Sequence, residues 1–141
     1  MTKSRQFTLV ASAFTLAVLA FAPRDIRAQG NTKVLVDAEW VIAAGSYQAE
    51  EFSTSGATFQ AKVAGLKHTD KGFRVRVVNA EDVTSCTVKG GTCRELASWT
   101  QPRTAAFTNT DQIPSGRWAF LVENSENILN KMTVSVYLAV N

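Results

Sequence analysis

Two apolar runs close to the carboxyl terminus constrain the fold most. The first alternates through Trp118, Phe120 and Val122, and the second through every other residue from 132 to 140. Side chains of a β-strand point to opposite faces in turn, so each run predicts a strand with one buried face. The polar, Asn-rich stretch between the runs predicts a loop. Together they are interpreted as a β-hairpin with a long connection.

The same alternation recurs upstream in short segments separated by turn residues. The expected strands are 33–42, 47–53, 57–66, 73–79, 81–88 and 105–109. The first is expected to be buried on both faces toward its end, and the second to turn Tyr47, Ala49 and Phe52 inward. No stretch after the amino-terminal segment shows a sustained helical period. This pattern predicts an all-β antiparallel β-sandwich of about seven or eight strands.

The amino terminus has the layout of a secretory signal peptide. Lys3 and Arg5 precede an uncharged apolar stretch, 6–23, which predicts a signal helix, and cleavage is expected after Ala28. Residues 29–141 would then form a single domain, periplasmic or secreted. The alternative is an uncleaved membrane anchor, because the apolar stretch approaches the length of a spanning helix.

Removal of the leader changes the charge of the chain. The whole sequence has 15 Lys and Arg against 12 Asp and Glu, a formal net charge of +3. The leader holds four basic residues and one acidic residue, so 11 of each remain and the mature chain is neutral. A neutral chain gives no support to binding of nucleic acid or of an acidic membrane, either of which would need a clustered basic surface.

Cys86 and Cys93 are the two cysteines of the chain. An even number of cysteines in an exported protein favours a disulfide. Gly90 and Gly91 lie between them, where the tip of a hairpin needs residues that adopt positive φ. The sequence therefore predicts a disulfide-bridged hairpin.

Three segments resemble a known class of domain. AGSYQAEEF (44–52), IPSGRWAFLVENS (113–125) and KMTVSVYLAV (131–140) are similar, in order and spacing, to strands of bacterial extracytoplasmic GOLD-like and pre-peptidase C-terminal-like β-sandwiches. The resemblance implies a jelly-roll or GOLD-like sandwich. It also implies a non-catalytic accessory or protein-interaction role, and it assigns no catalytic residue.

No motif of catalysis or metal binding stands out. His68, the one histidine, lies in a Lys- and Asp-rich loop and has no recognisable nucleophile beside it. The pairs Glu50–Glu51 and Glu81–Asp82 are neighbours on expected strands, so their carboxylates would point to opposite faces. We therefore expect no enzyme activity, no metal and no cofactor; a small secreted hydrolase is the least favoured alternative.

The candidate binding residues lie on loops and on one strand face. Arg74 and Arg76 are expected to project together into solvent, and the Asn-rich loop is expected to be free to bind. Trp99, in an aperiodic segment, could stack on a sugar. The full set is Trp99, Arg74, Arg76, Asn124, Glu126 and Asn127.

These observations predict an exported, non-catalytic β-sandwich that works by binding. The expected partner is a protein, either another molecule or a second copy of the chain. The alternative is a carbohydrate-binding module of the cell envelope that uses Trp99 and the polar loops. Contact with a membrane is expected only if the amino-terminal segment is left uncleaved.

Overall fold

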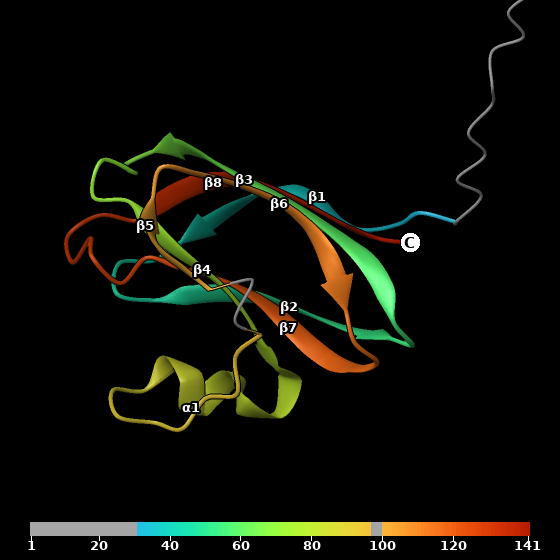
Figure 1. Cartoon of the computed structure of the whole chain (residues 1–141). Helices are drawn as coiled ribbons and strands as arrows, with labels where there is room; N and C mark the ends of the chain where they lie inside the picture. Colours follow the sequence, from blue (N-terminus) through green and yellow to red (C-terminus); the bar gives the residue numbers. More distant parts are fainter. Residues whose placement is uncertain (1–30, 97–99) are drawn as a thin grey trace, which may run out of the picture.

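A computed structural model describes residues 31–96 and 100–141 of the protein (Figure 1). These residues form two four-stranded antiparallel sheets that pack face to face, so the predicted all-β sandwich is confirmed. The expected signal helix, its cleavage point and Trp99 lie outside the described residues. In the part of the chain that is described, no helix is long and apolar enough to cross a membrane.

The first sheet has the strand order β1-β8-β3-β6. Its strands are β1 (Lys33–Ile42), β8 (Met132–Val140), β3 (Ala57–Lys67) and β6 (Ala106–Ile113). The second sheet has the order β2-β7-β4-β5. Its strands are β2 (Tyr47–Thr54), β7 (Gly116–Glu123), β4 (Phe73–Asn79) and β5 (Gln101–Thr104).

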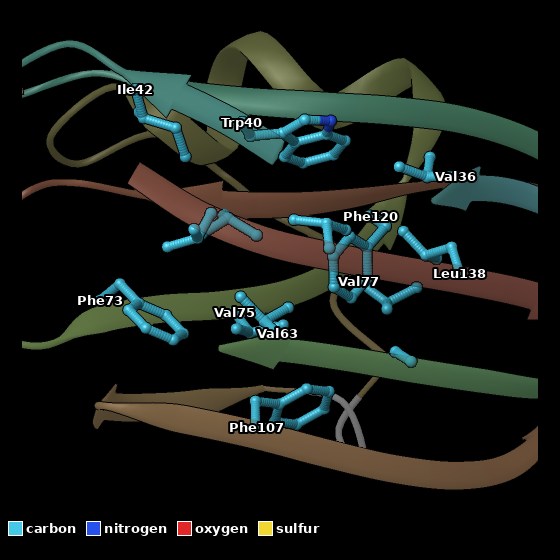
Figure 2. Packing of buried hydrophobic residues seen from close by; sticks show 14 of the residues in the cluster. Val36, Trp40, Ile42, Val63, Phe73, Val75, Val77, Phe107, Phe120 and Leu138 are labelled. Carbon is cyan, nitrogen blue, oxygen red and sulfur yellow. The ribbon is translucent and has the colours of Figure 1, made fainter. Parts of the chain in front are cut away.

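The core lies between the sheets and is built from alternate positions of their strands (Figure 2). On β4, Phe73, Val75 and Val77 point inward and are buried, as the alternation predicted. Aromatic rings join strands of the two sheets. The Phe59 ring lies 5.1 Å from that of Phe52 and 6.0 Å from that of Phe120, between ring centroids.

The two carboxyl-terminal strands do not form the predicted hairpin. β7 pairs with β2 and β4, whereas β8 pairs with β1 and β3 in the other sheet. Alternation indicates which side chains face the core, but it does not specify the partner strand, because facing strands of a sandwich share the pattern. The connection of residues 124–131 is long enough to cross the roughly 10 Å between packed sheets.

The expected strand 81–88 is helical instead. A 3-10 turn, η1 (Ala80–Asp82), runs into a short helix, α1 (Val83–Thr87). The Asn79 side chain caps the turn by accepting a hydrogen bond from the Glu81 amide, 3.1 Å away. The predicted Cys86–Cys93 disulfide is confirmed, with 4.7 Å between the Cα atoms, but it bridges a helix and a loop rather than two strands.

Two burial predictions for the first strands are wrong. Val41 of β1 is 55% exposed, because β1 is an edge strand of its sheet and the outer face of that sheet is open at this position. Tyr47 of β2 is also exposed, whereas Phe52 of the same strand is buried in the core. The expected strand at 105–109 exists but extends further, to Ile113.

The fold predicts that a charged substitution destabilises the protein far more on the inner face of a strand than on its outer face. Val136 of β8 is fully buried between the sheets, so Val136→Asp would place an unpaired charge in the core. We expect the domain to lose its cooperative unfolding transition in a urea titration followed by circular dichroism. Thr108→Asp, on an exposed position of β6, is the control and should change the free energy of unfolding by less than about 1 kcal/mol. Equal behaviour of the two variants would contradict this packing.

Candidate functional site

A covalently closed excursion leaves β4 and covers part of the outer face of the second sheet. It comprises residues 80–96, including α1 and the Cys86–Cys93 bridge, and we call it the disulfide excursion. Its end rejoins β4, since the Leu96 amide donates to the Val77 carbonyl at 2.9 Å. Beneath it lies a second apolar cluster, which consists of Val78, Cys86, Ala119 and Leu121 with Ala49, Val83 and Cys93 packed against it.

This cover explains why β7 is buried on both of its faces. Phe120 and Val122 point into the core between the sheets, while Ala119 and Leu121 point toward the disulfide excursion. All four side chains are fully buried. The continuous apolar run of β7 is the sequence signal for such two-sided burial.

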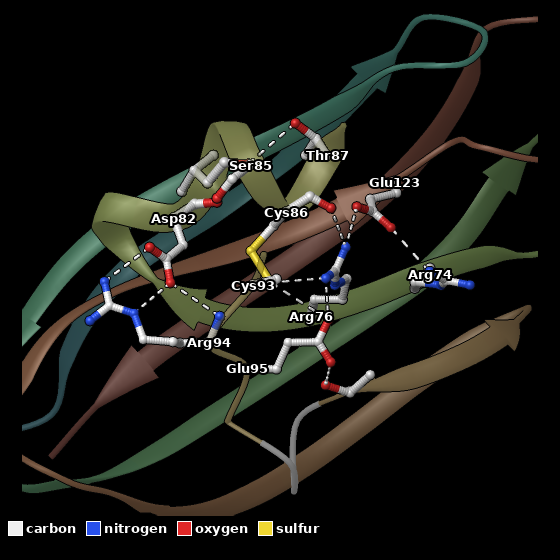
Figure 3. A network of polar contacts seen from close by, with 12 residues as sticks. Arg74, Arg76, Asp82, Ser85, Cys86, Thr87, Cys93, Arg94, Glu95 and Glu123 are labelled. Carbon is white, nitrogen blue, oxygen red and sulfur yellow. Dashed lines mark hydrogen bonds and ion pairs between the residues drawn. A yellow bond between two sulfur atoms is a disulfide. The ribbon is translucent and has the colours of Figure 1, made fainter. Parts of the chain in front are cut away.

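Arg76 is the polar centre of this region (Figure 3). Its Nη1 donates to the Cys86 carbonyl at 2.8 Å and to Glu123 Oε1 at 3.1 Å. Its Nη2 donates to Glu95 Oε1 and lies 3.0 Å from Cys93 Sγ. One guanidinium thus ties β4 to β7 and to both ends of the disulfide bridge.

The prediction that Arg76 projects into solvent with Arg74 is therefore wrong. Arg76 is only 6% exposed because the disulfide excursion covers it, while the Arg74 side chain stays 46% exposed. The residues around Arg76 in the sequence do not predict its burial. The carboxylates that pair with Arg76 lie 19 and 47 residues away along the chain.

The charges of this cluster nearly balance. Arg76 contacts the carboxylates of Glu95 and Glu123, and Arg74 Nε lies 4.0 Å from Glu123. Buried charges are tolerated when they are paired and hydrogen-bonded in this way, and removal of one partner leaves the other desolvated and unpaired. Arg76 Nε has no hydrogen-bond partner among the described residues.

A second ion pair closes the disulfide excursion at the surface. Arg94 donates to Asp82 from Nε at 2.7 Å, from Nη2 at 2.9 Å and from its backbone amide at 3.1 Å. The hydrogen bonds from the Arg94 side chain lower the pKa of Asp82 below its usual value. The same contact raises the pKa of Arg94.

A groove of about 900 Å³ runs between the disulfide excursion and the end of the second sheet. Arg74 and Glu123 lie on its sheet side, Lys89 on its excursion side, and Tyr47 and Glu126 belong to neighbouring segments. It therefore offers exposed cations, a tyrosine and carboxylates together. Such a surface can contact a polypeptide by hydrogen bonds and ion pairs.

The Asn-rich loop is not free to bind through Asn124. That side chain is fully buried, and its Nδ2 donates to the carbonyls of Ile42, Ala43 and Asn130 at 3.0–3.2 Å. The amide thus fastens the connection between the sheets to the end of β1. Asn124 Oδ1 has no partner among the described residues.

The Asn127 side chain also makes hydrogen bonds that hold the loop. Its Oδ1 accepts hydrogen bonds from the amides of Leu129 and Asn130, at 3.3 and 3.0 Å. Its Nδ2 donates to the His68 carbonyl at 3.4 Å, which joins this loop to the turn after β3. Glu126 pairs with Arg103 at 2.6 Å.

The structure thus separates the predicted binding residues into three groups. Arg74, Arg76 and Glu126 line one groove, Arg76 as a buried part of its wall. Asn124 and Asn127 hold a loop, and Trp99 lies outside the described residues. Sequence reasoning missed Tyr47 and Lys89 as members of the groove.

The histidine and the paired carboxylates lie on different elements: His68 in the turn after β3, Glu50–Glu51 on β2, and Glu81–Asp82 in η1. His68 is exposed and has a φ of 54° in the turn after β3. Within residues 31–96 and 100–141, no group of three or more His, Cys, Asp or Glu side chains could hold a metal ion.

No family model and no curated protein matches the chain. Among solved structures, it is similar to the pre-peptidase C-terminal domain of a collagenase from Bacillus anthracis, with 12% sequence identity and a TM-score of 0.49. The similarity covers 77% of this chain and 90% of that one. The proposals below rest on the residues of this chain alone.

Arg76 should contribute far more to stability than its neighbour on the same strand face. Arg76→Met removes the hydrogen-bonded partner of the buried Glu123 carboxylate and leaves it only the longer 4.0 Å contact with Arg74, so we expect the free energy of unfolding to fall by roughly 3–5 kcal/mol. Arg74→Met, at an exposed position, should cost less than about 1 kcal/mol. Urea unfolding measures both. Adding Glu123→Gln to Arg76→Met should recover part of the loss; no recovery would contradict the pairing.

The Asp82–Arg94 pair predicts a specific dependence of stability on pH. Because the pKa of Asp82 is lowered in the folded protein, its contribution is present above the pKa of the unfolded chain. It is lost as the pH falls through the lower folded value. The difference in free energy of unfolding between wild type and Asp82→Asn should therefore be constant near pH 7 and shrink below about pH 4. A difference that stays constant down to pH 2.5 would contradict this role.

Proposed function

We propose that this protein is an exported, non-catalytic binding module and that its partner is another protein. The groove between the disulfide excursion and the second sheet is the proposed contact surface. The observation that carries the proposal is that Tyr47, Arg74 and Lys89 line one groove. Tyrosine and arginine are the residue types that dominate the energetics of protein interfaces.

An ion pair and a disulfide stabilise the residues that form the groove. Arg76 and Glu123 pair at 3.1 Å beneath it, and the disulfide fixes the excursion that forms one wall. A preformed surface loses little conformational entropy on binding, and this favours affinity. The exposed cations Arg74 and Lys89 suit a partner segment that carries carboxylates.

Export is part of the proposal. The leader-like residues 1–28 and the Cys86–Cys93 disulfide support a location outside the cytoplasm, with cleavage after Ala28. A disulfide that braces the groove would be retained in an oxidising compartment. The binding function and the compartment therefore fit one another.

A photo-cross-linking amino acid at position 89 tests the contact directly. In cells that produce the protein, Lys89 replaced in this way should give a discrete adduct with a partner protein. The same replacement of Thr108, exposed on β6 of the other sheet, is the control and should not give that adduct. Identical adducts from both positions, or none from position 89, would overturn the groove as the contact surface.

The identified partner then permits an affinity measurement. We expect Arg74→Ala to weaken binding about 30-fold, the effect of losing an interface residue worth about 2 kcal/mol. Arg117→Ala removes an exposed arginine of β7 that does not line the groove and should leave the affinity unchanged. An adduct of twice the monomer mass would identify the partner as a second copy of the chain.

A further inference from the structure

Two neighbouring aliphatic side chains are held in solvent at the tip of the connection between the sheets. Ile128 is 78% exposed and Leu129 is 84% exposed. Scattered single apolar residues are ordinary on a protein surface, but an adjacent pair this exposed leaves a large apolar area in water. The hydrogen bonds around the pair show that its exposure is built into the loop.

Buried amides hold the loop in shape on both sides of the pair. Asn127 accepts hydrogen bonds from the amide of Leu129 itself and from that of Asn130. Asn124 donates to the Asn130 carbonyl and to the end of β1. These hydrogen bonds hold the backbone on both sides of Ile128 and Leu129 in the conformation that exposes the pair, and a rearrangement of this backbone would leave the buried Asn side chains without partners.

More exposed apolar residues lie at the same end of the first sheet. β1 and β3 end there, on either side of the start of β8, and Thr133 is paired with both Val41 and Lys67. Val41 is exposed, and so is Leu66, which lies at the irregularity of β3 beside Lys67. We call these four apolar residues, with the loops that carry them, the loop end; they are Val41, Leu66, Ile128 and Leu129.

The loop end is basic although the mature chain is neutral. Residues 67–72 and 124–131 contribute Lys67, Lys71 and Lys131, all exposed. The acidic residues of these two segments are Asp70 and Glu126, and Glu126 is paired with Arg103. The two loops at this end of the sheet therefore carry three exposed lysines against one further carboxylate, Asp70, an excess of positive charge that the overall charge did not reveal.

We propose that the loop end docks on the surface of an anionic lipid bilayer. Ile128 and Leu129 enter the boundary between headgroups and acyl chains, while the lysines contact the lipid phosphates. Aliphatic residues flanked by lysines are typical of proteins that lie on membranes. Protein interfaces instead favour aromatic residues and arginine and are depleted in lysine, so a protein partner fits this surface less well.

The proposed membrane contact is separate from the groove and from the leader. Its four apolar residues and its three lysines do not line the groove, although Ser125 and Glu126 of the loop before β8 do. It also differs from the expectation that membrane contact would need an uncleaved amino terminus. Loss of either proposed binding activity alone would leave the other intact.

Vesicle flotation tests the proposal with defined lipids. The exported protein is purified with the amino terminus that the cell leaves, and every variant is compared in that same form. The probes are vesicles of equal parts phosphatidylglycerol and phosphatidylcholine, and vesicles of phosphatidylcholine alone. We expect the wild type to float with the anionic vesicles and much less with the neutral ones.

Matched variants assign that binding to the loop end. Ile128→Ser and Leu129→Ser should each weaken binding to anionic vesicles about tenfold or more, because each removes a large inserted side chain. Lys131→Gln should weaken it about fivefold and reduce its dependence on salt. Val34→Ser, at an exposed valine near the opposite end of β1, is the control and should bind like the wild type.

Three outcomes would overturn the proposal. The wild type could fail to float with anionic vesicles, or the Ile128→Ser and Leu129→Ser variants could float as well as the wild type. The wild type could also elute as a dimer that these two variants dissociate, which would assign the loop end to a second copy of the chain. Thermal melting of each variant confirms that it is folded before it is compared.

Discussion

The contact between the buried Arg76 guanidinium and the carboxylates of Glu95 and Glu123 is the interaction on which the position of the disulfide excursion depends. It joins two strands of the second sheet to the disulfide excursion in a single cluster. The disulfide closes the excursion on itself, but a covalent loop of this size does not determine where it lies. Arg76 positions it, because both ends of the bridge and Glu95 converge on one side chain.

Asn124 stabilises the connection between the two sheets, as Arg76 stabilises the disulfide excursion. The chain must pass from β7 in one sheet to β8 in the other, and the backbone groups exposed by this crossing need partners. The Asn124 amide supplies them for Ile42, Ala43 and Asn130. A fixed crossing lets the same loop carry Glu126 toward the groove and Ile128 and Leu129 toward solvent.

The sequence predicted the features that follow from the alternation of side chains along one strand. It did not predict the features that depend on contacts between residues far apart in the chain. Phe73, Val75 and Val77 alternate, and their burial follows from that alternation alone. The pairing of β7 and β8 could not be predicted in the same way, since the two strands share a pattern but lie in different sheets. The five residues of α1 are too few to show a helical period.

Distant contacts also decide which residues of the candidate site are exposed. Arg74 and Arg76 are equivalent in the alternating pattern of the sequence. The disulfide excursion covers Arg76 and buries it, whereas the Arg74 side chain stays exposed. Asparagine in a loop is ambiguous in the same way. Asn124 could have bound a ligand or the backbone, and the crossing between the sheets decides for the backbone.

Hydrogen exchange measured peptide by peptide on wild type and Arg76→Met tests the central claim, that Arg76 holds the disulfide excursion on the second sheet. The strands β3 and β8 of the other sheet serve as the internal reference. In Arg76→Met we expect protection to fall in residues 80–96, and to fall there by more than in β3 and β8. Protection that falls equally in all these segments, or that stays unchanged in residues 80–96, would contradict it.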